Sequence, residues 1–315
     1  MMFLGIDTSN YTTSAALYDP ASGEVWMKKK LLPTSPGALG LRQSDAVFAH
    51  VKQLGEIAEG LFSSLPQKPE LSAVGVSAFP RREEGSYMPC FLVGETAARV
   101  LASAEGVPLF RFSHQEGHVA AALYSAGKLS WLSRRFLAFH LSGGTTDALL
   151  VEPENGFFTI KRVGGSLDLK AGQAVDRVGL MLGLSFPCGP ELSGLAARWT
   201  EPVRVKPVLK GTGCCLSGIE NKCADFARQG KPAAFIARYC LESIYAALAG
   251  MTEALLQEYG ELPLLYAGGV MSSQIIREKM EREYGGVFAE PKYSSDNAAG
   301  TAVLAAMAME KGGVQ

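Results

Sequence analysis

Apolar positions along the chain form two patterns, which are short continuous runs and longer stretches with helical spacing. The short runs are typical of buried strands, and the longer stretches repeat apolar residues every three or four positions, as one face of a helix does. Because both kinds of segment are mixed along the chain, the sequence predicts an α/β protein. We expect strands within 3–19, 73–77, 136–152 and 262–267, and helices over 46–62, 95–104, 234–259, 272–283 and 298–311.

Two of the strand regions resemble each other. Residues 3–19 (FLGIDTSNYTTSAALYD) and 136–152 (FLAFHLSGGTTDALLVE) align without a gap, and both have the pattern of a strand, a small polar turn and a second strand. Turns rich in Gly, Ser, Thr and Asn present backbone N–H groups and hydroxyls to an anion. We therefore expect a duplicated domain with a ligand bound between its copies; the alternative is a chance likeness between two hairpins.

A third glycine-rich turn follows the apolar run at 262–267. Gly268 and Gly269 separate that expected strand from the helix expected over 272–283. A double glycine between a strand and a helix allows a nucleotide to approach the backbone closely, although such a pair is more often just a tight turn. Together with the two hairpin turns, it favours a nucleotide site.

The candidate chemistry is concentrated in the sequence His-Gln-Glu-Gly-His at 114–118. Two imidazoles four residues apart lie on one face of a helix and can bind one metal ion. Ser113 and Glu116 form a capping-box pattern, which predicts that a helix begins at His114. A metalloprotease needs Glu directly after the first His, where this chain has Gln115, so a peptidase is disfavoured. The remaining alternative is a pair of surface histidines that bind nothing.

Composition narrows the class of protein further. A chain of 315 residues, 47% of them hydrophobic, can bury a large core divided between two lobes. The chain has 30 basic and 31 acidic residues, and its net charge of -1 gives no general attraction to nucleic acid. An RNA partner would therefore need a local basic patch or a helper protein. Six cysteines without the spacing of secreted proteins, and no apolar run of membrane length, predict a cytoplasmic protein without a membrane segment.

Taken in order, the motifs resemble the TsaD/Kae/Gcp family, the threonylcarbamoyl transferases of tRNA modification, once described as O-sialoglycoprotein endopeptidases. The likeness runs nearly end to end. It rests on Gly5-Ile6-Asp7-Thr8-Ser9, His114-x-x-x-His118, Ser142-Gly143-Gly144, residues 168–177 (DLKAGQAVDR), Leu182-Gly183-Leu184 with Gly189-Pro190, Leu216-Ser217-Gly218, Gly268-Gly269-Val270 and residues 295–299 (SDNAA).

The resemblance implies a duplicated actin-like or sugar-kinase-like (ASKHA) α/β fold, with two lobes and a nucleotide cleft between them. The N-terminal lobe would comprise residues 1–116, completed by 296–315, and the second lobe residues 117–295.

Carried over residue by residue, the resemblance implies that His114, His118 and Asp296 hold one divalent metal ion. Iron or zinc suits two imidazoles and a carboxylate, and magnesium stays open as a less expected choice. The ligand beside the metal would be ATP, AMP or an acyl-adenylate. The implied nucleotide contacts are Ser9, Asn10, Ser142, Gly143 and Gly144 at the phosphates, Asp176 at the ribose hydroxyls, Gly172 where the backbone approaches the nucleoside, and Gly189, Gly269 and Asn297 flanking it.

The family's reaction moves a threonylcarbamoyl group from threonylcarbamoyl-adenylate to adenosine 37 of tRNA. This metal-centred transfer needs no side-chain nucleophile, and none of the six cysteines lies in a motif for one. The partners that the resemblance implies are tRNA and the companion proteins of the same machinery, or a second copy of this chain.

The chain departs from the family on the side where the acceptor is expected. Residues 10–13 (NYTT) replace a short acidic run, segment 79–89 is longer and more charged than the usual turn, and Glu220 stands where a Lys is usual. The exchange of Lys for Glu weakens attraction to RNA. Two alternatives therefore stay open: a relative that carbamoylates another acceptor, and a nucleotide-binding partner that regulates a transferase without turnover.

Overall fold

The computed structural model describes residues 1–9, 11–33 and 41–312, so Asn10, expected at the phosphates, lies outside the described residues. The chain divides into two compact units, unit 1 (Met1–Leu129 with Asp296–Gln315) and unit 2 (Ser130–Ser295). The boundary between Ser295 and Asp296 lies where it was expected. The other boundary lies after Leu129 and not after residue 116, because residue 116 is in the first turn of helix α3 (His114–Ser125), which belongs wholly to unit 1.

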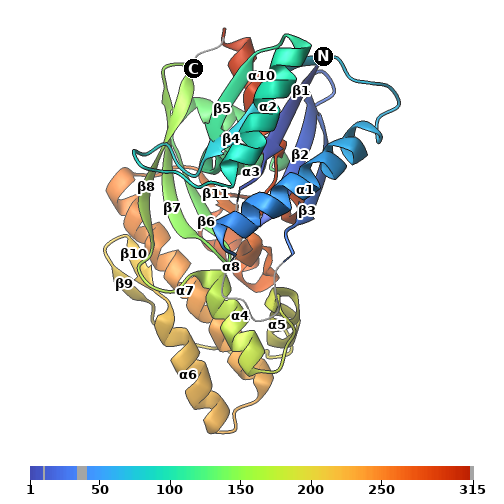
Figure 1. The fold of residues 1–315 in the computed structure, drawn as a ribbon. Coiled ribbons are helices and arrows are strands. Elements are labelled where there is room, and N and C mark those ends of the chain that lie inside the picture. The colour runs from blue at the N-terminus through green and yellow to red at the C-terminus, as the bar shows by residue number, and fades with distance from the viewer. Residues whose placement is uncertain (10, 34–40, 313–315) are drawn as a thin grey trace. The chain divides into compact units, whose positions relative to one another are not determined.

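Unit 1 is built on a five-stranded sheet with the order β3-β2-β1-β4-β5 (Figure 1). The first three strands form an antiparallel meander, whereas β4 and β5 join in parallel because a helix precedes each of them. The strands are β1 (Met2–Asp7), β2 (Thr12–Asp19), β3 (Glu24–Leu31), β4 (Leu71–Phe79) and β5 (Leu109–Ser113), and the helices are α1 (Gln43–Phe62), α2 (Phe91–Glu105), α3 and α10 (Ala299–Glu310).

The two faces of this sheet are covered differently. Leu4 and Ile6 of β1 point toward the apolar sides of α1 and α2. Because side chains alternate along a strand, Gly5 faces the other side, where a Cβ would overlap the backbone of α10 at Ala302. Helix α10 is rich in alanine and almost wholly buried, as the sequence predicted for 298–311. The small residues let α10 lie directly on the sheet.

Unit 2 contains a seven-stranded sheet with the order β12-β11-β6-β7-β8-β10-β9. Its largest core cluster joins the sheet to the long helix α7 and to the helices that pack around it. The elements are η1 (Leu129–Ser133, which begins at the last residue of unit 1), β6 (Phe136–Leu141), β7 (Thr146–Glu154), β8 (Phe157–Ser166), α4 (Ala171–Met181), α5 (Gly189–Ala196), β9 (Val208–Lys210), β10 (Gly213–Cys215), α6 (Ser217–Arg228), α7 (Ala233–Tyr259), β11 (Leu264–Ala267), η2 (Gly269–Ser272), α8 (Gln274–Tyr284), β12 (Val287–Phe288) and α9 (Pro291–Ser294).

The two units repeat one topology, which confirms the predicted duplication. In the first hairpin Phe3 pairs with Tyr18, and at the equivalent positions of the second hairpin Phe136 pairs with Val151, so the register is the same. A parallel strand then follows on the same side of the hairpin in each unit, β4 beside β1 and β11 beside β6. A chance likeness between two turns does not extend to register and neighbouring strands.

Three consecutive lysines, Lys28 to Lys30, lie on the edge strand β3. Among the described strands, β3 pairs only with β2. Lysines on a sheet edge oppose pairing with another chain, which explains their exposure without a nucleic-acid role. Among the described residues, no helix has both the length and the apolar character needed to span a membrane.

Candidate metal centre

Helix α3 begins at His114 because a capping box fixes its first turn. The Ser113 hydroxyl accepts a hydrogen bond from the Glu116 backbone N–H at 3.1 Å, and the Glu116 carboxylate accepts from the Ser113 N–H at 2.6 Å. Arg82 donates to the same carboxylate at 3.0 and 3.3 Å. Glu116 is thus committed to the helix start and to a salt bridge, which supports the case against a peptidase base.

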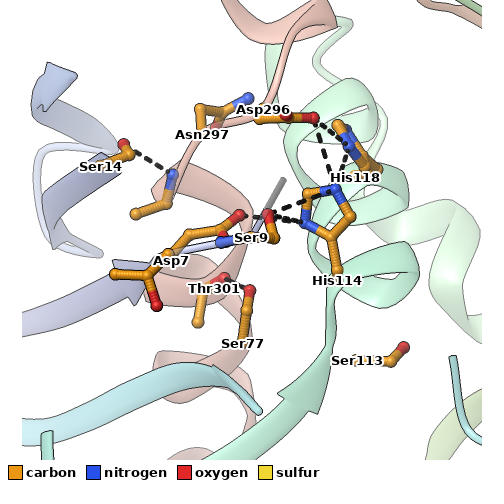
Figure 2. A network of polar contacts seen from close by, with 12 residues as sticks. Asp7, Ser9, Ser14, Ser77, Ser113, His114, His118, Asp296, Asn297 and Thr301 are labelled. Atoms are coloured by element: carbon orange, nitrogen blue, oxygen red, sulfur yellow. Dashed lines mark hydrogen bonds and ion pairs between the residues drawn. The ribbon is translucent and has the colours of Figure 1, made fainter. Parts of the chain in front are cut away.

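His114, His118 and Asp296 converge in unit 1 (Figure 2). The two Nε2 atoms lie 2.8 Å apart, and Asp296 Oδ1 lies 3.2 Å from that of His118 and 3.4 Å from that of His114. Metal–ligand bonds of about 2.1 Å that meet at right or tetrahedral angles place ligand atoms about 3.0–3.4 Å apart. Two of the three distances lie in this range, and the third, between the two Nε2 atoms, is slightly shorter. The three donor atoms are therefore placed to bind one divalent cation from one side, with positions left for a substrate.

Close packing of α3 on α10 sets the position of Asp296, which lies in the segment that leads into α10. A Cβ added at Gly300 would overlap the carbonyl of Gly117 on α3 and lie 2.7 Å from Ala121 N. Gly117 lies one turn after His114 on α3. The two segments that carry the metal ligands therefore touch at Gly117 and Gly300, which have no side chains to keep the backbones apart. This contact ties Asp296 to the histidine pair despite the long chain between them.

The far side of the His114 ring is held by the end of β1. Asp7 Oδ2 lies 3.1 Å and Ser9 Oγ 2.8 Å from His114 Nδ1, while the Ser9 N–H donates to Asp7 Oδ1 at 2.8 Å. Ser9, expected at the phosphates, is fully buried beside this imidazole, and its contact with a phosphate stays a prediction. Asp7 was given no role from the sequence, although a carboxylate that ends a buried strand before a polar turn was a usable signal.

Burial and charge act in opposite directions on the pKa values of the cluster. Burial lowers the pKa of His114, but the Asp7 and Asp296 carboxylates outweigh it and raise that pKa to about 10. Burial and the neighbouring charge of His114 lower the pKa of His118. Burial favours the neutral form of Asp296, yet hydrogen bonds from both histidines hold its pKa below the usual value. A cation bound by the three groups would therefore take the place of a proton on His114.

In unit 2 the residues expected around the nucleotide gather at the start of α4. The Gly172 N–H donates to Ser142 O at 3.0 Å, and a Cβ at Gly172 would lie 2.5 Å from Gly143 N. Gly172 therefore permits close contact between α4 and the turn after β6, and the expected approach of its backbone to a nucleoside stays a prediction. Gly143 and Gly144 are exposed, with open space beside them, as a phosphate-binding turn requires.

Asp176 lies one turn after Gly172 on the same face of α4. Its Oδ1 accepts from the Cys188 N–H at 2.9 Å, and burial raises its pKa. This bond connects α4 to Gly189, the first residue of α5, and the ribose contact of Asp176 stays a prediction.

The double-glycine turn has one residue that must be glycine. Gly268 has φ 98° and no space for a Cβ beside the carbonyl of Leu141, whereas Gly269 is exposed with open space. Asn297, expected beside the nucleoside, lies in unit 1, and its side-chain oxygen accepts from the Ala299 N–H at 3.0 Å at the start of α10. The structure therefore brings the three metal candidates together in unit 1 and the glycine turns together in unit 2.

A sequence model of the family described as tRNA N6-adenosine threonylcarbamoyltransferase (TsaD) matches residues 37–303. Component A of the (R)-2-hydroxyglutaryl-CoA dehydratase from Acidaminococcus fermentans is 17% identical, with 97% of both chains covered and a TM-score of 0.56. A ROK family glucokinase from Streptomyces griseus, solved with glucose and AMPPNP, is 16% identical, with 97% of this chain and 99% of that chain covered and a TM-score of 0.53.

HypF from T. kodakarensis has a TM-score of 0.62 at 11% identity, with 98% of this chain covered but only 48% of that one. At such identities the likeness concerns the fold alone. That fold is the duplicated actin-like and sugar-kinase-like α/β architecture, in agreement with the repeat read from the two hairpins.

Proposed function

The chain belongs to the family of tRNA N6-adenosine threonylcarbamoyltransferases, and from this premise we propose that it is a metal-dependent transferase that moves a threonylcarbamoyl group from threonylcarbamoyl-adenylate to adenosine 37 of tRNA. The observation that carries the proposal is the convergence of His114, His118 and Asp296 with the spacing of ligands to one divalent cation. Iron or zinc fits two imidazoles and a carboxylate best.

When bound, the cation supplies Lewis-acid stabilisation of negative charge on a substrate oxygen. The chain's own groups have complementary tasks in this proposal. The exposed N–H groups of the Gly143–Gly144 turn bind the phosphate of the adenylate, because backbone amides in such a turn attract an anion without a counter-charge. Asp176 binds the ribose hydroxyls through the oxygen that Cys188 leaves open.

Direct transfer, without a covalent enzyme intermediate, agrees with the properties of three buried cysteines. Burial raises the pKa of Cys214 to about 11 and that of Cys223 to about 12, and it raises the pKa of Cys240 well above its usual value. A thiol that keeps its proton at neutral pH is a poor nucleophile. The amine of the acceptor then attacks the threonylcarbamoyl carbonyl directly. The bond between that carbonyl carbon and the phosphate oxygen breaks, AMP leaves, and the amine nitrogen gives up one proton to water.

A second candidate is transfer of a carbamoyl group to another acceptor, and one observation favours keeping it. Segment 79–89, which is longer and more charged than the family's usual turn, contacts helix α3 in two ways. These are the Arg82–Glu116 salt bridge and a hydrogen bond of 3.2 Å from the Gln115 N–H to Pro80 O. A charged segment held against the first turn of α3 is suited to select an acceptor. A non-catalytic nucleotide-binding regulator is the remaining alternative.

Nucleoside analysis of tRNA tests the proposal. Cells that lack this gene, and any second family member, should lose threonylcarbamoyladenosine and recover it with the wild-type gene but not with Asp296→Ala. Asp19→Ala is a matched control, since Asp19 is a partly exposed aspartate of the same unit. Unchanged threonylcarbamoyladenosine in the deletion strain would exclude the tRNA reaction. Full recovery with Asp296→Ala would instead favour the regulator.

A further inference from the structure

His114 can bind a cation through Nε2 only if its single proton is on Nδ1, and the hydrogen bonds at Nδ1 decide where the proton lies. Two oxygens face this nitrogen, Ser9 Oγ at 2.8 Å and Asp7 Oδ2 at 3.1 Å (Figure 2). A hydroxyl can donate or accept, so Ser9 alone is compatible with both tautomers. An ionised carboxylate can only accept.

We propose that Asp7 is a positioning residue that fixes His114 in the tautomer with Nδ1 protonated, so that the lone pair of Nε2 faces the cation. The inference rests on the proposed metal site. A carboxylate behind a metal-binding imidazole both selects the tautomer and makes the other nitrogen a better donor to the metal. Asp7 does not touch the cation; it acts through the ring of His114.

The carboxylate of Asp7 is held so that only one of its two oxygens, Oδ2, faces the imidazole. Asp7 is 1% exposed at the end of β1, where its backbone is paired opposite Ser14 on β2. Oδ1 accepts the Ser9 N–H at 2.8 Å, which leaves Oδ2 for the imidazole. One residue thus connects the turn after β1 to the helix that carries the histidine pair.

This arrangement makes an unusual prediction for Asp7→Asn. The Ser9 N–H needs an acceptor, so the amide oxygen takes the place of Oδ1 and the amide NH2 faces His114 Nδ1. That nitrogen must then accept, and the proton moves to Nε2, where the cation has to bind. In Asp7→Ala the Ser9 hydroxyl stays beside Nδ1, and because a hydroxyl can donate or accept it permits either tautomer. Asp7→Asn should therefore bind the metal more weakly than Asp7→Ala, although Asn is the closer match in shape.

The experiment measures Zn²⁺ and Co²⁺ dissociation constants at pH 7 for the full chain and its variants. We expect affinity losses of about 10-fold for Asp7→Ala and about 100-fold for Asp7→Asn, the range found when the partner behind a ligand is removed. Ser9→Ala, which keeps Asp7, should lose less than Asp7→Asn. The matched control is Asp19→Asn, the same change at a partly exposed position of the unit, which should bind as the wild type does.

Imidazole ¹⁵N–¹H NMR of the zinc-loaded protein gives a readout that a merely structural role would not change. The wild type and Ser9→Ala should show the proton of His114 on Nδ1, and these two spectra suffice if the Asp7 variants fail to fold. A proton on Nε2 in the wild type, or an Asp7→Asn variant that binds metal as well as Asp7→Ala, would overturn the inference while the metal site stands. A wild-type protein that binds neither metal would overturn the proposed metal site, and the inference with it.

Discussion

The contact between Gly117 and Gly300 should control metal binding, although neither residue has a side chain to offer a ligand. A Cβ added at Gly300 would overlap the Gly117 carbonyl and lie 2.7 Å from Ala121 N. Carbon atoms make favourable contacts at about 3.5–4.0 Å, so Gly300→Ala must move α10 away from α3 by about 1 Å. Asp296 lies three residues before Ala299, the first residue of α10, and must move with the helix.

The ligand geometry does not tolerate such a shift. The three donor atoms lie 2.8–3.4 Å apart, and a functional site must be held to within about 0.5 Å of its productive geometry. We expect Gly300→Ala to weaken zinc binding at least tenfold. Overpacking should also lower the free energy of unfolding by about 1–3 kcal/mol.

The control is Gly60→Ala in α1, because no heavy atom lies within 4 Å of the added methyl group. Replacing an exposed helical glycine by alanine should stabilise the protein by up to about 1 kcal/mol and leave zinc affinity unchanged. Zinc titrations and urea unfolding measure both quantities in both variants. A Gly300→Ala protein that binds zinc with wild-type affinity would show that the α3–α10 contact does not set the site.

Three further predictions follow from named contacts. The pKa of His114 is raised to about 10, so protonated His114 stabilises the metal-free protein fully below about pH 6.5 and loses this effect as the pH rises toward 10. The free energy of unfolding in urea should therefore be lower at pH 9 than at pH 6. The His114→Gln variant should not show this decrease. Arg82→Ala should lower the free energy of unfolding by about 1–3 kcal/mol because Glu116 is buried, whereas Arg42→Ala, a change in an exposed pair, should alter it by less than about 1 kcal/mol. Gly172→Ala should move α4 away from the turn at Gly143 and abolish AMP binding, measured by calorimetry. Retained AMP binding would show that this turn is not part of the nucleotide site.

The parts of the structure that depend on neighbouring residues were predictable from the sequence. The start of α3 follows from Ser113 and Glu116, which lie within one turn, and the structure has both hydrogen bonds of the capping box. The duplication followed from a gapless alignment of two hairpins, since a shared pattern of apolar and small residues specifies a shared register. Both features are local, so tertiary packing did not need to be known.

What could not be predicted depends on contacts between distant segments. Asp7 meets His114 only because β4 and β5 join beside β1 in parallel, which brings the end of β5 and the start of α3 to the end of β1. The sequence did not show that Gly172 and Gly300 each permit two backbones to touch, because each contact joins segments that are distant along the chain. The first unit boundary was expected after residue 116, whereas helix α3 continues to Ser125 and belongs to unit 1, which a local sequence pattern did not show.

The central claim, that a metal held by His114, His118 and Asp296 serves transfer to tRNA, is tested most directly by a single-turnover assay. Purified protein, first stripped of metal and then restored with Fe²⁺ or Zn²⁺, is mixed with labelled threonylcarbamoyl-adenylate, tRNA and the companion proteins of the host machinery. The claim predicts label in tRNA for the restored wild type and none for the stripped protein or for Asp296→Ala. Equal labelling by the stripped protein, or none with metal restored, would contradict it.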